Sequence, residues 1–315
     1  MKKIVVLGGG TGLSVLLKGL KQFPLDITAI VTVADDGSSS GELRKEFDIF
    51  AVGDIRNVLV SLSEVEPLIE ELLQYRFNTD NSLNNHPMGN LLLTALYNIT
   101  GNLTESLRSL SKIFNIKGTI LPFTEENPVL IAHTKDGQVI EGESKITKAG
   151  KEIDYIEYKE KVKPTKEVIE AIDSADLIIF GIGSLYTSII PNLICNEIKD
   201  AIDKSNAEVM YVCNIVTQPG ETDNFKVSDH VNALNEYLGD KKVSVVVANS
   251  GAISKKMAEK YSNTEQKDPV IFDKKALKNM GLKIISDDFV TITDDTLRHD
   301  VIKLGLQIFT YLLEG

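Results

Sequence analysis

The hydrophobic and polar positions at the start of the chain predict a strand, a loop and a helix. Residues 4–7 form a continuous apolar run, which stops at a glycine-rich stretch over residues 8–12. Apolar positions with helical spacing follow over residues 13–22, and a second apolar run covers residues 27–33. The order of strand, helix and strand is typical of a parallel βαβ unit.

Three later apolar runs predict further strands of the same sheet. They cover residues 177–180, 209–212 and 243–248, and each is followed by Gly, Asn or Ser and then by a helical pattern. Continuous apolar runs are typical of parallel strands that are buried on both faces. The sequence therefore predicts an α/β fold with a mostly parallel sheet and helices on both faces.

Two stretches interrupt this alternation. Residues 55–115 show helical spacing and predict an added helical layer. Residues 119–163 contain a turn at 135–137 between short alternating segments, which predicts a β-hairpin insertion. We expect a single domain over residues 1–315 that contains both insertions. The chain ends in a predicted amphipathic helix with these inward residues: Leu297, Val301, Leu304, Ile308 and Leu312.

The composition narrows the class of protein. The 315 residues include 34 Lys and Arg against 45 Asp and Glu, a formal net charge of −11, which disfavours broad contact with nucleic acid or anionic lipid. No apolar run approaches the ~18 residues of a membrane span. Cys195 and Cys213 are too few for a disulfide framework or a zinc site, and they are expected to be buried packing thiols. We therefore expect a cytoplasmic protein that neither binds nucleic acid nor inserts into a membrane.

The glycine loop over residues 8–12 is the first candidate site. Glycines permit a close approach of the backbone, and the helix that follows presents unpaired N–H groups to an anion. A phosphate site is the functional interpretation, and a tight turn without a ligand is the alternative. The spacing does not match the dinucleotide-binding fingerprint, because Leu13 stands where its third glycine belongs, and it does not match a P-loop.

Carboxylates follow the second predicted strand, and the carboxyl ends of such strands face the ligand crevice of an open sheet. Asp35 and Asp36 could bind a ribose, hold Mg²⁺ against a diphosphate, or cap the next helix. Asp54 lies near the start of a further helix, as a cap or as a ligand. The histidines show no metal-ligand spacing. Any metal is therefore expected to be Mg²⁺, held by Asp35, Asp36 or Asp54 together with the phosphates of a bound nucleotide.

Three further segments place polar groups at strand ends or helix starts. In residues 85–90 a proline begins a helix, where His86 is a cap or a ligand and Asn90 could point at the crevice. Residues 181–192 form a second glycine loop that suits a phosphate or a sugar, and residues 214–222 add neutral hydrogen-bonding groups that suit hydroxyl-rich ligands. The alternative for both segments is an ordinary polar loop at a strand end. Ser184 has no evident base and is not predicted to be a nucleophile.

Taken in order, several segments of the chain resemble the gluconeogenesis-factor family (YvcK-like), which belongs to the CofD-like superfamily with 2-phospho-L-lactate transferase. The segments are GGGTG, TVADDGSSSGELR, GDIRN, HPMGN, GIGSLYTSIIPNL and NIVTQPGETD. The resemblance implies a Rossmann-like core, an added helical layer, a nucleotide crevice and self-association, for example as a dimer. It also implies a cytoplasmic protein that is linked to carbon metabolism and cell shape and binds UDP-sugars such as UDP-N-acetylglucosamine.

The resemblance also implies ligand residues. One departure is Ile182, where most relatives are expected to have proline. Tyr261 and the segment from Leu297 to Asp300, including Arg298, correspond to the uridine and diphosphate side, and the Asp35, Asp36 and Asp54 segments line the crevice. The phosphate loop and the opposite wall comprise Gly9, Gly10, Thr11, Gly12, Ser184, Leu185, Thr187, Asn192, Thr217, Gln218, Gly220 and Glu221.

Three functions compete at this point. The leading hypothesis is a non-catalytic UDP-sugar binding regulator, because the crevice residues include no convincing nucleophile, base or metal cluster. The second is a Mg²⁺-dependent transferase of the 2-phospho-L-lactate transferase type, in which Asp35, Asp36 and Asp54 hold metal or acceptor. The third, a nicotinamide-dependent oxidoreductase, rests on the first glycine loop alone.

Overall fold

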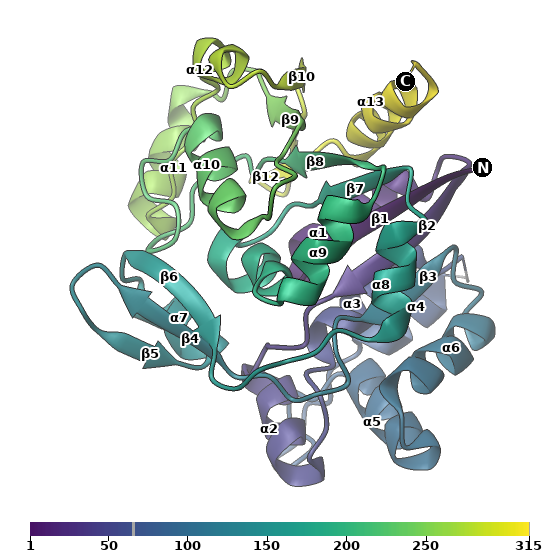
Figure 1. Ribbon diagram of the computed structural model, residues 1–315. Helices are drawn as coiled ribbons and strands as arrows, with labels where there is room; N and C mark the ends of the chain where they lie inside the picture. The colour runs from purple at the N-terminus through teal and green to yellow at the C-terminus, as the bar shows by residue number, and fades with distance from the viewer. Residues whose placement is uncertain (65–66, 315) are drawn as a thin grey trace.

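The central sheet of the protein is parallel throughout. In the computed structural model, which describes residues 1–64 and 67–314, all of its strand pairs run in the same direction. Across the sheet the strands are β10 (Lys283–Asp287), β9 (Val245–Asn249), β8 (Glu208–Val212), β7 (Leu177–Phe180), β1 (Lys2–Gly8), β2 (Leu25–Val31) and β3 (Thr119–Pro122) (Figure 1). The predicted α/β class with a Rossmann-like sheet is confirmed.

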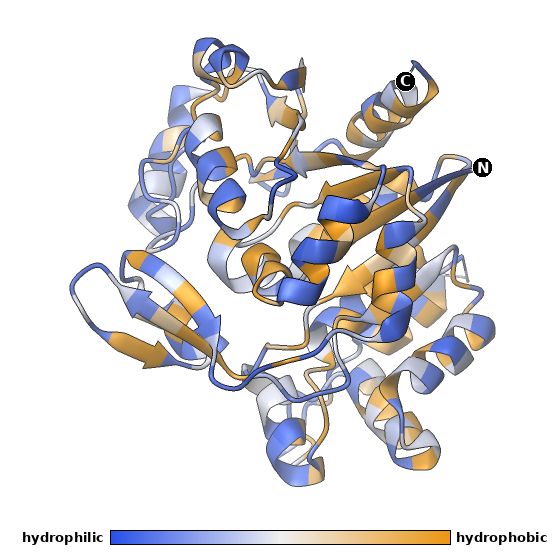
Figure 2. Cartoon of the chain, in the orientation of Figure 1, coloured by the Kyte–Doolittle hydropathy of each residue, from blue (hydrophilic) through white to orange (hydrophobic). Residues whose placement is uncertain are grey.

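Side chains alternate along each central strand and enter two separate cores. Ile4 and Val6 of β1 pack on one face of the sheet, whereas Val5 and Leu7 pack on the other. All four are at most 2% exposed. The strands are apolar along their whole length because both faces are covered, and Figure 2 shows them as continuous hydrophobic segments between helices of mixed character.

The face of Ile4 and Val6 is covered by helices from both ends of the chain. α1 (Gly10–Leu20) packs between α3 (Gly53–Leu62) and α13 (Val301–Glu314). Leu304, Ile308 and Leu312 of α13 are buried in this core, as predicted. The predicted helical layer is formed by α3 with α4 (Pro67–Gln74), α5 (Met88–Thr100) and α6 (Leu103–Ile113), and α2 (Ser38–Phe47) precedes it.

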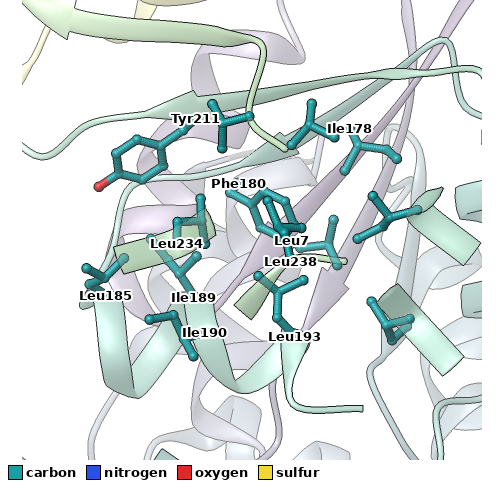
Figure 3. Packing of buried hydrophobic residues seen from close by; sticks show 14 of the residues in the cluster. Leu7, Ile178, Phe180, Leu185, Ile189, Ile190, Leu193, Tyr211, Leu234 and Leu238 are labelled. Atoms are coloured by element: carbon teal, nitrogen blue, oxygen red, sulfur yellow. The ribbon is translucent and has the colours of Figure 1, made fainter. Parts of the chain in front are cut away.

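The opposite face is covered by α8 (Lys166–Asp173), α9 (Asn196–Lys204) and α10 (Val227–Tyr237). Two short turns of helix, η1 (Leu185–Ile189) and η2 (Ile190–Leu193), follow β7 after the glycine loop of residues 181–184. Figure 3 shows their apolar side chains against Phe180 and Leu234. Leu185 belongs to this packing and is fully buried, so its side chain supports the loop from inside the core.

The predicted hairpin region contains a small antiparallel sheet. Its strands are β5 (Val139–Glu141), β4 (Leu130–Thr134) and β6 (Ile153–Tyr158), with α7 (Glu143–Ala149) between β5 and β6 (Figure 1). The start of the predicted insertion was placed too early, because β3 pairs with β2 in the central sheet. A short apolar strand at a sheet edge has the same local pattern as a hairpin strand, and only its partner distinguishes them.

The C-terminal part of the chain adds α11 (Lys255–Glu265), α12 (Lys274–Asn279) and a hairpin of β11 (Val290–Thr293) and β12 (Thr296–His299). Leu297 therefore lies in β12, and its predicted place in the last helix was wrong. The loop between the hairpin and α13 is short. The apolar positions of β12 and α13 therefore follow one another closely in sequence, and Leu297 matches the helical spacing of α13 by coincidence.

Two further sequence predictions meet the structure here. None of the helices described combines the length and the apolar character needed to cross a bilayer. Cys195 and Cys213 are both free and buried, as predicted.

Candidate functional site

The order of the strands creates a crevice between β1 and β7. From β1 the chain continues to β2 and β3 on one side of the sheet, and it then crosses to β7, β8, β9 and β10 on the other side. Because the strand order reverses there, the loops that follow β1 and β7 lead to opposite sides and leave a crevice between them. Ligands bind in such a crevice in open α/β sheets. The glycine loops after β1 and β7 therefore face each other.

A cavity of ≈ 450 Å³ occupies this crevice. Its lining confirms that the chain brings the two glycine loops and the segment after β8 together. The lining residues are Gly9, Gly10, Thr11, Gly12, Ile182, Gly183, Ser184, Ser188, Asn214, Ile215, Val216, Thr217, Gln218, Lys267, Leu297 and His299.

The first wall of the cavity is the loop after β1, and its conformation requires glycines at two positions. Gly10 has a φ of +66°, which an L side chain rarely adopts. A Cβ on Gly12 would lie 2.3 Å from the carbonyl oxygen of Ile182, so the backbones of the two loops touch at this point. Gly9 supplies no side-chain cap to α1, and the first turn of α1 contains no acidic residue. Asp54 of α3 accepts only from the first N–H of the helix, that of Gly10. The start of α1 therefore keeps its positive end directed at the cavity.

The opposite wall is fixed by hydrogen bonds between the loops after β7 and β8. The Asn214 side chain accepts from the Gly183 N–H (3.1 Å) and donates to the Gly183 carbonyl (2.7 Å). The Ser184 hydroxyl donates to the Gln218 side chain (2.8 Å). Asn214 begins the predicted segment 214–222, but it was not named among the site residues, although asparagine directly after a buried strand is a recognisable signal.

A third wall comes from the hairpin near the C-terminus. Leu297 and His299 of β12 face the cavity, whereas Arg298 between them is exposed on the other face of the strand. Tyr261 does not line the cavity. It is buried, and its hydroxyl accepts from the Leu297 N–H (2.8 Å), so it supports the hairpin from behind.

The cavity contains one neutral ring, that of His299, and one amino group, that of Lys267. The His299 Nε2 atom lies 3.4 Å from the Cys213 carbonyl, and burial lowers the pKa of His299 to about 4, so the ring is neutral at pH 7. Lys267 contributes an amino group, which pairs with Glu265 at 2.8 Å. Lys267 follows α11 without any motif around it, and no sequence signal identified it.

Other predicted residues stand behind the second wall. Glu221 is buried and accepts from the Tyr186 N–H (2.8 Å) and from the Thr187 hydroxyl (2.9 Å). Burial raises the pKa of Glu221 to about 7. Asn192 donates to two backbone carbonyls of the same turn. Gly220 accepts from Ile153 of the antiparallel sheet (3.0 Å). These residues position the loop.

A second, smaller pocket of ≈ 180 Å³ lies beside the first, toward the helical layer. Asp54 lies between the two, because the Gly10 N–H donates to its carboxylate and Asp54 also lines the smaller pocket. The lining of the smaller pocket is Asp35, Gly37, Ser39, Ser40, Gly53, Asp54, Arg56, Asn57, Arg76 and Asn90. Three predicted residues, Asp35, Asp54 and Asn90, therefore belong to this pocket.

The carboxylates near this pocket have raised pKa values. Burial, and then repulsion from Asp35, raises the pKa of Asp54 to about 7. The same two causes raise the pKa of Glu143, on α7, to about 8. Burial is also the main cause that raises the pKa of Asp35. Glu143 was not predicted, because it reaches this group from the antiparallel insertion.

The acids do not converge into a metal site by themselves. Within the described residues, no three His, Cys, Asp or Glu side chains are arranged so that they could hold a metal ion. Asp36 turns away from Asp54 and accepts from the Ser144 N–H of α7 (2.8 Å). A cation at Asp35 and Asp54 would therefore need oxygen atoms from a bound ligand to complete its coordination.

The segment around Pro87 fixes the amide of Asn90. The Ser39 hydroxyl lies 2.8 Å from Nδ1 of His86, whose Nε2 lies 3.1 Å from a Glu42 carboxylate oxygen. The Asn90 Nδ2 donates to the same hydroxyl (3.1 Å). His86 is 4% exposed and acts as a buried link between α2 and α5.

Comparison with known proteins agrees with this architecture. The family profile of 2-phospho-L-lactate transferase CofD matches residues 4–290. The chain belongs to the CofD family. Within this family it is 49% identical over 315 residues to the gluconeogenesis factor of Halalkalibacterium halodurans, a match that covers 100% of this chain and 96% of that protein. The gluconeogenesis factor of Bacillus subtilis is 48% identical, over 99% of this chain and 98% of the relative. The predicted resemblance to the gluconeogenesis factors is confirmed.

A solved structure shares the whole CofD-family fold. The crystal structure of a protein from Bacillus halodurans superposes with a TM-score of 0.94 at 48% identity, and the match covers 98% of this chain and 99% of that one. The fold of the chain is therefore that of a protein with a solved crystal structure.

Proposed function

We propose that this chain is a gluconeogenesis factor that binds a UDP-sugar, such as UDP-N-acetylglucosamine, in the crevice between β1 and β7 and acts as a regulator. The observation that carries the proposal is the start of α1, which has no acidic residue in its own first turn and faces a second glycine loop across a cavity of ≈ 450 Å³. The names of the relatives supply the link to gluconeogenesis. The UDP-sugar is inferred from the family resemblance and from the chemistry of the walls.

The walls offer different chemistry to the parts of such a ligand. The diphosphate fits the backbone N–H groups of Thr11 and Gly12, because a helix N-terminus stabilises an anion. Lys267 provides a positive charge in the same cavity. The hydroxyl groups of the sugars fit the neutral side chains of Ser184, Thr217 and Gln218, which line the cavity and can both donate and accept hydrogen bonds.

A regulatory role is proposed because the hydroxyl groups of the cavity lack an activating base. The Ser184 hydroxyl donates to Gln218, an amide that cannot take a proton from it. His299 is neutral and lies against a backbone carbonyl. In the described part of the cavity, no nucleophile is paired with a base at hydrogen-bond distance.

The test is a calorimetric titration with UDP-N-acetylglucosamine, followed by a product assay on the same sample. We expect saturable binding and unchanged ligand. UMP and ADP-glucose serve as controls for the sugar and for the base. In cells, loss of binding should accompany loss of growth and of normal shape on gluconeogenic carbon sources. We further propose that the protein is cytoplasmic and forms a dimer, as the family resemblance implies. A fluorescent fusion tests the location, and light scattering of the pure protein tests the dimer.

A second candidate, a transferase of the 2-phospho-L-lactate transferase type, is favoured by the acids beside the start of α1. Asp35 and Asp54 would hold Mg²⁺ together with ligand phosphates, and the metal would neutralise charge on a diphosphate. Asp54→Asn distinguishes the two functions. A variant that binds UDP-sugar normally but no longer supports growth would favour the transferase and contradict the regulator.

A further inference from the structure

The smaller pocket in the helical layer contains positive charge that the nucleotide proposal does not use. Arg56 of α3 and Arg76, just after α4, both line it. α2 begins at the same pocket, with Gly37 as its N-cap, no side-chain cap and no acidic residue in its first turn. Two guanidinium groups and the positive end of a ten-residue helix therefore meet in one small space.

Arg56 is buried there and forms no ion pair within the part of the chain that the structure describes. Its residue is 8% exposed, its Nε has no hydrogen-bond partner, and its Nη2 donates to the neutral side chain of Asn57 (2.8 Å). Within the described residues, no carboxylate lies within ion-pair distance of Arg56. A buried guanidinium that lacks a paired anion is costly, so an anionic ligand beside Arg56 would stabilise it.

The carboxylates of the pocket accept hydrogen bonds from backbone N–H groups rather than from Arg56. Asp35 accepts from the Gly37 N–H (2.9 Å), and Asp54 accepts from the Gly10 N–H. Their charges offset part of the charge on Arg56, but Arg76 repels it. Arg76 is exposed and donates to the Asn85 carbonyl (2.9 Å), and it too forms no ion pair with any residue that the structure describes.

A second buried group of the pocket lacks a partner. Asn90 is 2% exposed, and its Nδ2 donates to Ser39 while its Oδ1 accepts nothing. The stem of Arg56 packs on Gly89, where a Cβ would lie 2.8 Å from Cγ of Arg56. The glycine next to Asn90 therefore allows the arginine side chain to pass into the pocket.

We propose that this pocket is a second ligand site, which binds a small molecule with a phosphate or carboxylate group between Arg56 and Arg76 at the start of α2. Guanidinium groups bind both anions through charge-assisted hydrogen bonds. A volume of ≈ 180 Å³ is too small for a nucleotide sugar and suits a metabolite of a few carbon atoms. The site lies beyond Asp54 from the UDP-sugar cavity, and it does not depend on the proposal made for that cavity.

The test uses three probes: inorganic phosphate, glycerol 3-phosphate and malonate. Each is titrated calorimetrically against the full chain, with and without saturating UDP-N-acetylglucosamine. We expect at least one probe to bind in both conditions. Binding of the two phosphates alone identifies a phosphate site, and binding of malonate alone identifies a carboxylate site. No binding of any probe at about 10 mM would overturn the proposal.

Variants place the bound anion. Arg76→Gln should weaken binding about tenfold or more, because a charge-assisted hydrogen bond is lost. Arg76 is exposed, so this variant should fold, while Arg56→Gln tests the buried partner. Arg108→Gln is the matched control, since Arg108 is an exposed arginine of α6 that pairs with Glu105. Equal affinity of the Arg76 and Arg108 variants would overturn the proposal.

The UDP-sugar proposal and this one fail separately. Lys267→Gln should weaken nucleotide binding and leave anion binding unchanged, because Lys267 lines only the larger cavity. If UDP-N-acetylglucosamine displaces the anion competitively, the anion occupies the diphosphate position and the second site is refuted. If the nucleotide does not bind at all, the comparison of Arg76→Gln with Arg108→Gln still decides.

Discussion

The side chain of Asn214 makes two hydrogen bonds with the backbone of Gly183, one to its N–H at 3.1 Å and one to its carbonyl at 2.7 Å. Asn214 follows β8 and Gly183 follows β7, so this pair connects the loops of two neighbouring strands at the edge of the proposed nucleotide cavity. The shape of the cavity therefore depends on one amide side chain.

Replacing Asn214 by alanine should damage both stability and binding. The Gly183 N–H and carbonyl lose their partner, which should cost about 1–2 kcal/mol of the free energy of unfolding. We expect about a tenfold loss of affinity for UDP-N-acetylglucosamine, measured by calorimetry. Asn249→Ala is the matched control, because Asn249 makes the same kind of contacts with Gly251 at the end of β9, outside the cavity lining. A similar loss of affinity in both variants would contradict the role of Asn214.

A methyl group on Gly12 should separate the two glycine loops. The added Cβ would lie 2.3 Å from the Ile182 carbonyl oxygen, so backbone must move. We expect a loss of about 2 kcal/mol or more in unfolding free energy, with weaker UDP-sugar binding. Gly8→Ala is the control, since its nearest contact would be an ordinary 3.6 Å to Leu13. Denaturant unfolding of both variants tests this, and equal stabilities would refute the close approach.

The raised pKa of Asp54 predicts a pH-dependent stability. Its pKa is 3.8 when unperturbed and about 7 in the folded protein, so between these values the folded state binds more protons and loses stability as the pH rises. Asp54→Asn removes this penalty. The free energy of unfolding of the variant, relative to that of the wild type, should therefore rise by about 2 kcal/mol as the pH increases from 5 to 8. A difference that stays constant across this range, measured by urea unfolding, would show that Asp54 has an ordinary pKa.

Adjacent residues of β12 should differ in their effect on nucleotide binding. His299 faces the cavity and Arg298 is exposed on the other face of the strand. We expect His299→Ala to weaken UDP-sugar binding about fivefold or more and Arg298→Ala to change it by less than about twofold. The family resemblance instead implies that Arg298 is a ligand residue. A strong loss in Arg298→Ala with no loss in His299→Ala would show that the hairpin presents its other face to the ligand.

Much of the fold could be predicted because the signals are local. The run of residues 177–180 coincides with β7, since a strand buried on both faces must be apolar at every position. The glycines at positions 9, 10 and 12 also predict their loop, because no other residue allows such close approach of two backbones. The edge strand β3 was assigned to the hairpin insertion, because its pairing with β2 spans almost a hundred residues of sequence.

The candidate site also has some features that the sequence predicted and others that only the tertiary structure decided. Sequence alone determined that glycines and polar residues follow the strands β1, β2, β7 and β8, and parallel pairing then brings those ends to one edge. Only the tertiary structure decided that Lys267 lines the larger cavity and Glu143 reaches the acids. It also decided that His299 and not Arg298 faces inward. The period of a strand determines that neighbouring side chains point to opposite sides. Which of the two sides faces the cavity depends on the element that packs against the strand, and here that element is α11, through Tyr261.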